Sequence, residues 1–187
     1  MNGLNNITIY CMKGPRGDDA SFKQEFLETH NTYRARHGAQ PLTYNSELNA
    51  AAQKWADHLL QTNSSEHSKS GENIFNMSSS EPLKLTGKEA VESWYNEIKD
   101  YNWGRPGFSG STGHFTQVVW KESIELGVGL ATDGNNVFVV GQYRPPGNML
   151  ECFEKNVLPQ AGREAGGADN TSNETAGVSP RKICTLL

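Results

Sequence analysis

The side chains of this chain that are best suited to chemistry are its five histidines. A neutral imidazole is a good zinc ligand, and it can also act as a general acid or base near neutral pH. His30, His37 and His58 fall on expected helices and are interpreted as packing or surface residues. His67 and His114 lie far apart in the chain, so only the fold can bring them together.

A hydrolytic enzyme needs an activated nucleophile, and the sequence contains no recognisable one. It has no Gly-x-Ser-x-Gly turn, no His-Glu-x-x-His helix and no phosphate-binding Gly-Lys-Ser/Thr loop. Ser109, Ser111 and Thr112 precede His114, but their loop is rich in glycine, which is typical of a segment chosen for backbone freedom. We therefore expect a protein without catalytic activity.

The last four residues, Cys184 to Leu187, form a Cys-a-a-X ending. A final leucine is typical of geranylgeranylation, and Arg181 and Lys182 precede the cysteine, although Thr185 is not aliphatic. A single lipid chain anchors stably only with a second membrane signal. Cys184 is therefore a candidate prenylation site, and an ordinary chain end is the alternative.

The composition argues against a nucleic-acid role. The chain has 187 residues and a net charge of −4, so it has no general attraction for nucleic acid or anionic lipid. No apolar run approaches the roughly 20 residues that span a bilayer. The first ten residues lack the basic leader and apolar core of a signal peptide, so secretion is not expected.

The three cysteines, Cys11, Cys152 and Cys184, form an odd and sparse set. Such a set makes a poor disulfide framework and favours a reducing compartment. Five Asn-x-Ser/Thr sequons occur as well, and without a route into the secretory pathway we interpret them as polar loop composition. They are Asn6, Asn63, Asn76, Asn170 and Asn173.

Apolar periodicity predicts three helices before the main strands. Ser21 is expected to cap the first helix, Ser46 the second, and residues 88–101 to form the third. The β-branched runs 127–131 and 137–143 predict two strands joined by a hairpin. Helices first and strands last are typical of an α+β layered domain.

The composition also divides the chain into three parts. Residues 1–20 are expected to form a flexible extension, and residues 21–159 the folded domain. From Gln160 onward, small and polar residues dominate and almost nothing can be buried. Residues 160–187 are therefore expected to be a disordered tail.

Four segments together resemble the CAP superfamily of cysteine-rich secretory, antigen 5 and pathogenesis-related proteins. They are His30–Arg34, Gly71–Asn73, Gly113–Trp120 and Gln142–Asn148, and the last two are similar to the two signature stretches of the superfamily. The resemblance covers about residues 22–158. It implies a three-layer α-β-α sandwich, in agreement with the α+β class expected from the elements.

Three further segments are similar to the Golgi-associated plant-pathogenesis-related subgroup, which lacks the disulfides of its secreted relatives. They are Trp94–Tyr101, Pro106–Phe108 and Glu154–Pro159. Gly141 stands where the second signature of secreted members usually has cysteine. The resemblance therefore implies a protein at the cytoplasmic face of Golgi or other membranes, with the cytosol as the alternative.

The resemblance also implies a site of two histidines and two glutamates in a central cleft. Carried over motif by motif, the four residues are His67, Glu72, Glu97 and His114. Neutral imidazoles suit zinc, and carboxylates can orient them, so zinc is the cofactor that such a tetrad could take. The alternative is that two hydrogen-bonded His–Glu pairs only hold loops onto the fold.

The function that the resemblance implies is that of a non-catalytic module which binds sterol or anionic phospholipid in membranes and forms a homodimer. Ile74, Phe75 and Phe108 are the candidate lipid contacts, and burial in the core is the alternative for them. Two other functions stay open. One is a metal-dependent hydrolase or protease that uses the tetrad, and the other is a regulatory module that binds a partner protein through its outer surface.

Overall fold

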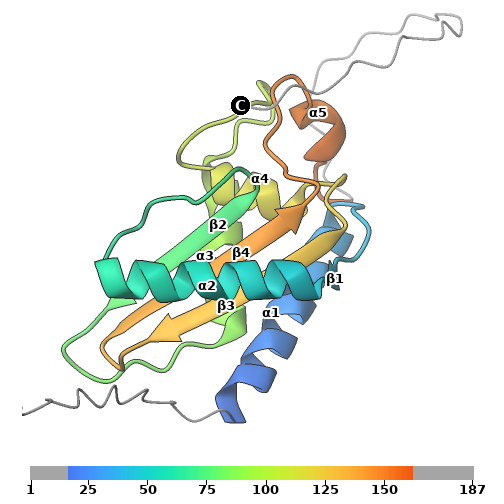
Figure 1. Cartoon of the computed structure of the whole chain (residues 1–187). Helices are drawn as coiled ribbons and strands as arrows, with labels where there is room; N and C mark the ends of the chain where they lie inside the picture. The colour runs from blue at the N-terminus through green and yellow to red at the C-terminus, as the bar shows by residue number, and fades with distance from the viewer. Residues whose placement is uncertain (1–16, 162–187) are drawn as a thin grey trace, which may run out of the picture.

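A mixed four-stranded sheet lies at the centre of the structure (Figure 1). The computed structural model describes residues 17–161. The strands are β1 (Thr43–Tyr44), β2 (Glu72–Ser78), β3 (Glu125–Thr132) and β4 (Asn136–Arg144), and they lie in the order β1-β3-β4-β2. The pairs β3–β4 and β4–β2 are antiparallel, whereas the short β1 runs parallel to β3.

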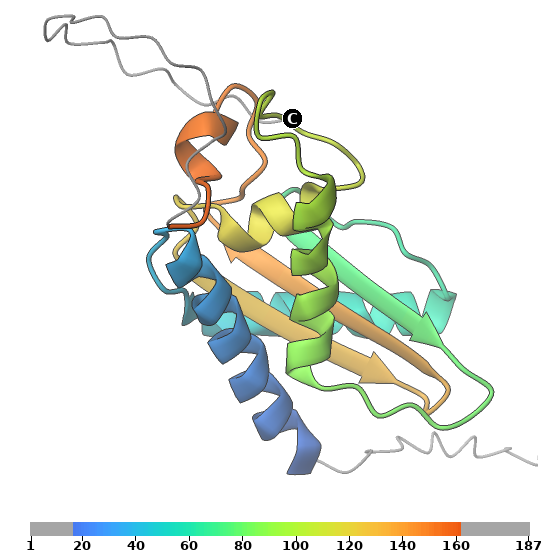
Figure 2. The same ribbon diagram turned by 180° about the vertical axis from the view of Figure 1, so that it is seen from behind.

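Helices cover both faces of the sheet. The helix α2 (Ser46–Thr62) crosses the face toward the viewer in Figure 1, while α1 (Gly17–Arg36) and α3 (Gly87–Tyr95) cross the face seen in Figure 2. The shorter elements are η1 (Asn96–Asp100), α4 (Gly113–Val119) and α5 (Phe153–Asn156). The α+β class and the three-layer α-β-α sandwich are therefore confirmed. No helix within residues 17–161 is long and apolar enough to cross a bilayer.

The helix α2 lies very close to the sheet because the facing residues are small. Ala52 and Ala56 are fully buried in this layer, and β3 carries glycines beneath the helix. A Cβ atom at Gly129 would lie 2.3 Å from the Ala52 carbonyl oxygen, and a Cβ atom at Gly127 would lie 2.3 Å from the carbonyl carbon of Leu48. These two glycines therefore permit the close approach of the layers.

The larger core lies between the opposite face of the sheet and α1, α3 and α4. It is rich in aromatic side chains, among them Phe26, Trp94 and Phe115. Arg34 of α1 is also fully buried, and its guanidinium donates hydrogen bonds to backbone carbonyl oxygens at and just beyond the end of α4. These bonds satisfy acceptors that no helical N–H reaches, and they fix α4 to α1.

The first helix begins earlier than expected. It starts at Gly17, so Ser21 lies inside α1 and does not cap it. Asp19 in the first turn pairs with Lys23 at an Oδ2–Nζ distance of 3.0 Å. An acidic side chain near a helix N-terminus and an ion pair one turn apart both favour the helix, which explains why the helix includes the end of the expected flexible extension.

The other two expected helices also differ at their ends. Asn45, not Ser46, caps α2, because its side-chain oxygen accepts two backbone N–H groups of the first turn at 2.9 and 3.1 Å. The third helix was expected over residues 88–101, but α3 ends at Tyr95 and the chain tightens into the 3-10 helix η1. This tightening is what places Glu97 near the start of α4.

Both predicted strands are confirmed as β3 and β4, but the strand β2 was not predicted. It contains Ile74 and Phe75, two of the candidate lipid contacts. Its apolar residues are few and are interrupted by Asn76, so the local pattern is weak. The strand forms because β4 pairs with it along its whole length, with seven aligned residue pairs from Glu72 to Ser78.

Cys152 is buried and disulfide-bonded, which contradicts the expectation drawn from the three cysteines. An odd number of cysteines excludes a fully paired framework, but it still allows one bridge. Cys152 is the only cysteine in residues 17–161. The cysteine count therefore no longer supports a reducing compartment.

The end of the described chain is fixed to α1 and α3. Gln160 donates a hydrogen bond to the Tyr95 hydroxyl at 2.7 Å, and the backbone N–H of Ala161 donates to the Arg36 carbonyl oxygen at 3.0 Å. The flexible extension and the disordered tail expected from the sequence lie mostly outside the described residues. The candidate prenylation site Cys184 lies outside them as well.

Candidate functional site

Both histidines of the expected tetrad line one cleft with a volume of about 580 Å³. Its walls come from the segment that leads into β2, from the loop that leads into α4, and from the segment after β4. Among the lining residues are His67, Lys69, Glu72, Phe108 and His114, whereas Glu97 is not one of them. The fold thus brings together three segments that lie far apart in the sequence.

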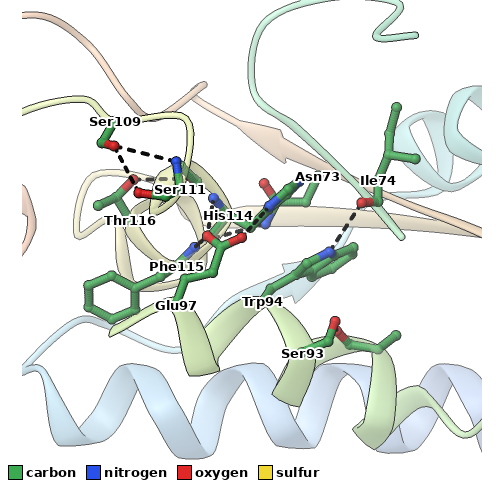
Figure 3. Close-up of polar contacts among 12 residues, drawn as sticks. Asn73, Ile74, Ser93, Trp94, Glu97, Ser109, Ser111, His114, Phe115 and Thr116 are labelled. Carbon is green, nitrogen blue, oxygen red and sulfur yellow. Dashed lines mark hydrogen bonds and ion pairs between the residues drawn. The ribbon is translucent and has the colours of Figure 1, made fainter. Parts of the chain in front are cut away.

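Glu97 holds His114 by its ring and by its backbone (Figure 3). One carboxylate oxygen, Oε1, accepts a hydrogen bond from His114 Nδ1 at 2.7 Å. The other, Oε2, accepts the backbone N–H groups of His114 and Phe115 at 3.0 and 3.1 Å. These N–H groups belong to the first turn of α4, where a carboxylate is favourable. Because the carboxylate oxygen accepts, His114 Nδ1 is the donor, and in the neutral imidazole the lone pair is then on Nε2.

His67 and Glu72 form a second and looser pair. The distance from His67 Nδ1 to Glu72 Oε1 is 3.4 Å, and the His67 side chain is 52% exposed while that of Glu72 is fully buried. Glu72 also accepts hydrogen bonds from Ser68 N, Ser68 Oγ and Gln142 Nε2 at 3.0, 2.7 and 2.8 Å. Burial favours a higher pKa for the Glu72 carboxyl, but these bonds outweigh it and lower the pKa. Glu72 is therefore ionised at neutral pH.

The two histidines differ in how firmly they are positioned. The ring of His114 is stacked on the buried indole of Trp94, with ring centres 6.1 Å apart and an angle of 13° between the planes. Trp94 is itself fixed, since its indole N–H donates to the Ile74 carbonyl oxygen at 3.3 Å (Figure 3). His114 is therefore rigid, whereas the exposed His67 has more freedom to adjust to a ligand.

The tetrad does not form a complete metal site by itself. Among residues 17–161, no group of three or more His, Cys, Asp or Glu side chains is arranged to hold a metal ion. Glu72 and Glu97 already accept several hydrogen bonds each. The Nε2 atoms of His67 and His114 remain, and imidazoles whose Nδ1 is bound by a carboxylate are the ligands that zinc prefers. The donor chemistry fits zinc, with water or a ligand completing its coordination.

The three candidate lipid contacts have different environments. Ile74 is 8% exposed and packs in the layer beneath α2, so its assignment as a lipid contact is wrong, because β2 turns this side chain into the core. Phe75 is half-buried and lines a separate cavity of about 260 Å³ beside α3. Only Phe108 lies at the wall of the cleft, and it is 55% exposed.

The other three histidines are not among the residues that line the cleft. His30 and His37 are buried, and burial lowers the pKa of both, that of His30 to about 3. His58 stacks on Trp55 with ring centres 4.6 Å apart and is half-buried on α2. Their environments agree with the interpretation of these residues as packing or surface groups.

Sequence reasoning did not single out the residues that fix the carboxylates. Gln142 lies in β4 directly opposite Glu72, and Ser68 donates two hydrogen bonds to the same carboxylate. A signal was present, because Gln142 is a polar residue inside the mainly apolar strand predicted over 137–143, and buried polar groups need partners. The identity of the partner depends on strand register, which local pattern does not specify.

Comparison with known proteins gives consistent matches. A model of the cysteine-rich secretory protein family (CAP) matches residues 27–143. The human Golgi-associated plant pathogenesis-related protein 1 is 43% identical over 148 residues, which cover 74% of this chain and 93% of that protein. The hookworm platelet inhibitor has a similar fold with a TM-score of 0.58 and 27% identity, covering 73% of this chain and 75% of that one. The crystal structure of NaASP2 with Zn²⁺ also matches with a TM-score of 0.58 and 27% identity, covering 79% and 90%.

Proposed function

The chain belongs to the cysteine-rich secretory protein family (CAP), and we propose that it is a non-catalytic member that binds lipid at Golgi or related membranes. The observation that carries the proposal is the exposed aromatic side chain of Phe108 on the wall of a cleft that also contains Lys69. The likeness to the human Golgi-associated protein supports the choice of membrane. The ligands proposed are sterol or anionic phospholipid.

An apolar side chain beside a cation suits a membrane surface. Phe108 is 55% exposed, and Leu150, which follows the cleft residue Met149, is 44% exposed. Burial of apolar surface is favourable by about 25 cal/mol per Å², and a basic residue near an anionic membrane contributes about 1 kcal/mol. Because the net charge of the chain is −4, attraction to such a membrane cannot come from the overall charge, and we propose that it comes from this face.

Vesicle flotation tests this proposal. We expect the full chain to float with vesicles that contain anionic phospholipid or sterol, and Phe108→Ser to lose most of this binding. Ile124→Ser is the matched control, because Ile124 is also 55% exposed but does not line the cleft. Flotation of the Phe108 variant at the level of the unmodified protein would contradict the proposal.

A contribution from the chain end is tested separately. We propose prenylation of Cys184, and metabolic labelling with an isoprenoid analogue should label the full chain but not Cys184→Ser. A chain that ends at Pro159 should keep the flotation that depends on Phe108, since the cleft lies entirely before that residue. If Cys184→Ser were labelled as strongly as the full chain, the proposal of prenylation at Cys184 would be wrong. The proposal for the cleft would not be affected.

The hydrogen bonds of the two glutamates support a non-catalytic role. A general base needs a carboxylate oxygen that is free to take a proton, but Glu97 caps α4 and Glu72 accepts bonds from Ser68 and Gln142. The alternative of a metal-dependent hydrolase makes a clear prediction. If the protein cleaves a peptide library and both His67→Ala and His114→Ala abolish cleavage, the hydrolase replaces the present proposal.

Zinc binding in the cleft is a second candidate function. It is favoured by the two imidazoles whose Nδ1 atoms face carboxylates, and a structural relative, NaASP2, was crystallised with Zn²⁺. When bound, zinc would supply a Lewis acid that polarises a ligand oxygen or a water molecule. His67 and His114 would hold it through Nε2, and Glu72 and Glu97 would orient the two rings.

Calorimetric titration with Zn²⁺ tests this second candidate. His114→Ala should lose more affinity than His67→Ala, because the His114 ring is rigidly held while the His67 ring is half exposed. His58→Ala is a suitable control, since His58 faces Glu66 at 3.7 Å in a similar pair outside the cleft. Equal zinc affinity in the unmodified protein and in the three variants would show that zinc does not bind in the cleft.

The third function is a regulatory module that binds a partner protein through its outer surface. Affinity capture that persists after substitution of His67, Glu72, Glu97 and His114 would favour it over both cleft functions. We also propose a homodimer, on the basis of the family resemblance. Sedimentation equilibrium of the purified chain would test this, and a monomer at micromolar concentration would contradict it.

A further inference from the structure

We propose that Asn73 controls what the histidine cleft accepts, by presenting its amide oxygen to the cleft in a fixed orientation. This inference rests on the zinc-binding candidate for the same site. Asn73 lines the cleft although it is only 1% exposed, and Figure 3 shows it beside His114. Its proposed role is to accept a hydrogen bond from a water molecule bound to the metal.

Two hydrogen bonds determine which end of the Asn73 amide faces the cleft. Nδ2 donates to the His114 carbonyl oxygen at 3.1 Å and to the Tyr143 hydroxyl at 3.3 Å. A carbonyl oxygen can only accept, so the amide nitrogen and not the amide oxygen has to face His114. Both N–H bonds of the amide are thereby used. The oxygen, Oδ1, accepts no hydrogen bond from any residue within the described part of the chain.

A buried chain of hydrogen bonds behind Asn73 holds this orientation. His30 Nδ1 lies 2.8 Å from the Phe26 carbonyl oxygen, and His30 Nε2 lies 2.7 Å from the Tyr143 hydroxyl oxygen. The carbonyl oxygen requires that Nδ1 donates, and burial keeps the imidazole neutral by lowering its pKa to about 3. Nε2 therefore accepts, and Tyr143 donates to it.

That assignment determines which group donates in each hydrogen bond between Asn73 and Phe26. Because the Tyr143 proton points to His30, the lone pairs of the phenol oxygen are available to Asn73 Nδ2. Asn73 donates to Tyr143, Tyr143 donates to His30, and His30 donates to Phe26. If the Asn73 amide were reversed, the His114 carbonyl oxygen and the Tyr143 hydroxyl would both lose the hydrogen bond from Nδ2. The loss of these buried hydrogen bonds costs free energy. This series of hydrogen bonds thus supports one acceptor, Asn73 Oδ1, at the cleft wall.

The cleft then offers three acceptors on fixed or nearly fixed side chains. They are Oδ1 of Asn73 and, in the neutral imidazoles, Nε2 of His67 and Nε2 of His114. A set made only of acceptors suits a cation, or the hydrogen atoms of water bound to one, because these supply positive charge and donors. Asn73 is thus a positioning residue for metal-bound water, in addition to the two imidazoles that bind the metal itself.

Titration of the full chain with Zn²⁺ and Co²⁺ tests the role of Asn73. Asn73→Leu removes the acceptor and keeps a similar volume, and we expect at least a tenfold loss of zinc affinity, the size of effect that residues beside metal ligands commonly have. Tyr143→Phe keeps the acceptor but removes its support, so a smaller loss of zinc affinity than in Asn73→Leu is expected. The visible spectrum of bound Co²⁺ should change in Asn73→Leu, because the arrangement of bound water differs.

Asn156→Leu is the matched control. Asn156 is 1% exposed and is also fixed by side-chain hydrogen bonds, to the backbone of Cys152 and Glu122, but it lies outside the cleft. It should lose thermal stability without changing zinc affinity or the Co²⁺ spectrum. A folded Asn73→Leu protein with unchanged affinity and spectrum would overturn the proposal. If that variant does not fold, unchanged affinity and spectrum in Tyr143→Phe would overturn it instead.

Zinc binding by the unmodified protein distinguishes failure of the zinc site from failure of the role of Asn73. If the unmodified chain binds no Zn²⁺, the zinc candidate fails and the role of Asn73 fails with it. If the chain binds zinc and loses it in His114→Ala but not in Asn73→Leu, only the role of Asn73 fails. Loss of zinc affinity in both variants, with Asn156→Leu unaffected, is the result that we expect.

Discussion

Glu72 and Gln142 lie directly opposite each other in β2 and β4, and Gln142 Nε2 donates to Glu72 Oε2 at 2.8 Å. The backbone of Glu72 is paired within the sheet, so its carboxylate cannot move away from His67 unless the strand also moves. The acidic half of this pair therefore belongs to the rigid sheet. The histidine half lies in the exposed segment before β2, and the adjustable part of the site is on that side.

Glu72 should make the unfolding free energy depend on pH in the acid range. Hydrogen bonds lower its pKa in the folded protein, so the stabilisation is complete above the carboxyl pKa of the unfolded chain. It is lost as the pH falls through the lower folded pKa. Urea unfolding between pH 7 and 3 should show a flatter profile below about pH 5 in Glu72→Gln. Glu81→Gln, at an exposed position, should keep the original profile, and the same profile in both variants would contradict the prediction.

His30 should reduce stability at mildly acidic pH. Burial lowers its pKa to about 3 in the folded protein, while an unfolded histidine has a pKa of about 6.5. The unfolded chain therefore takes up the proton first, and each pH unit below about 6.5 costs about 1.4 kcal/mol of stability until the folded protein is protonated as well.

The variant His30→Gln should therefore show a weaker decline in unfolding free energy between pH 7 and 5 than the unmodified protein. Carboxyl groups with lowered pKa values do not titrate in this range, so the effect of Glu72 is excluded. His58→Gln, at a half-buried surface position, is the control. An identical slope in the unmodified protein and in His30→Gln would show that His30 is not kept neutral by the fold.

Replacing Glu97 with Gln should weaken both the start of α4 and the site. The amide keeps one acceptor oxygen, which cannot serve the His114 ring and the backbone N–H groups of His114 and Phe115 together. We expect a loss of about 1–2 kcal/mol, measured as a lower Tm by circular dichroism. Glu92→Gln on the neighbouring α3 is the control, since Glu92 makes only a long hydrogen bond of 3.4 Å to Tyr33 and a 3.7 Å ion pair with the exposed Lys88. Equal Tm values for Glu97→Gln and Glu92→Gln would contradict this prediction.

Gly129→Ala should destabilise the layer formed by α2 and the sheet. The added Cβ would lie 2.3 Å from the Ala52 carbonyl oxygen and 2.4 Å from the Gln53 backbone nitrogen, so the helix would have to move away from the strand. Overpacking of this kind typically costs about 1–3 kcal/mol. Gly107→Ala is the control, because nothing lies within 4 Å of its Cβ position. Thermal unfolding should give a clearly lower Tm for the Gly129 variant only.

Much of the fold could be predicted because its signals are local. The β-branched run 137–143 and the hairpin before it predicted β4 and β3, and helical periodicity predicted α1, α2 and α3. Boundaries were less accurate, since Asn45 and Ser46 are both good caps and only the observed contacts distinguish them. The strand β2 was missed because Ile74 and Phe75 form a short apolar pair whose strand structure depends on β4.

The sequence alone determined the chemical types present and the family resemblance, since both are properties of residues read in order. Only the tertiary structure decided that His67 and His114 share a cleft, that the Nδ1 of each faces a glutamate, and that Asn73 lines the same cleft. It also decided that Ile74 is buried while Phe108 is exposed. The physical reason is that burial and hydrogen-bond direction depend on contacts between segments far apart in the chain, which local patterns do not encode.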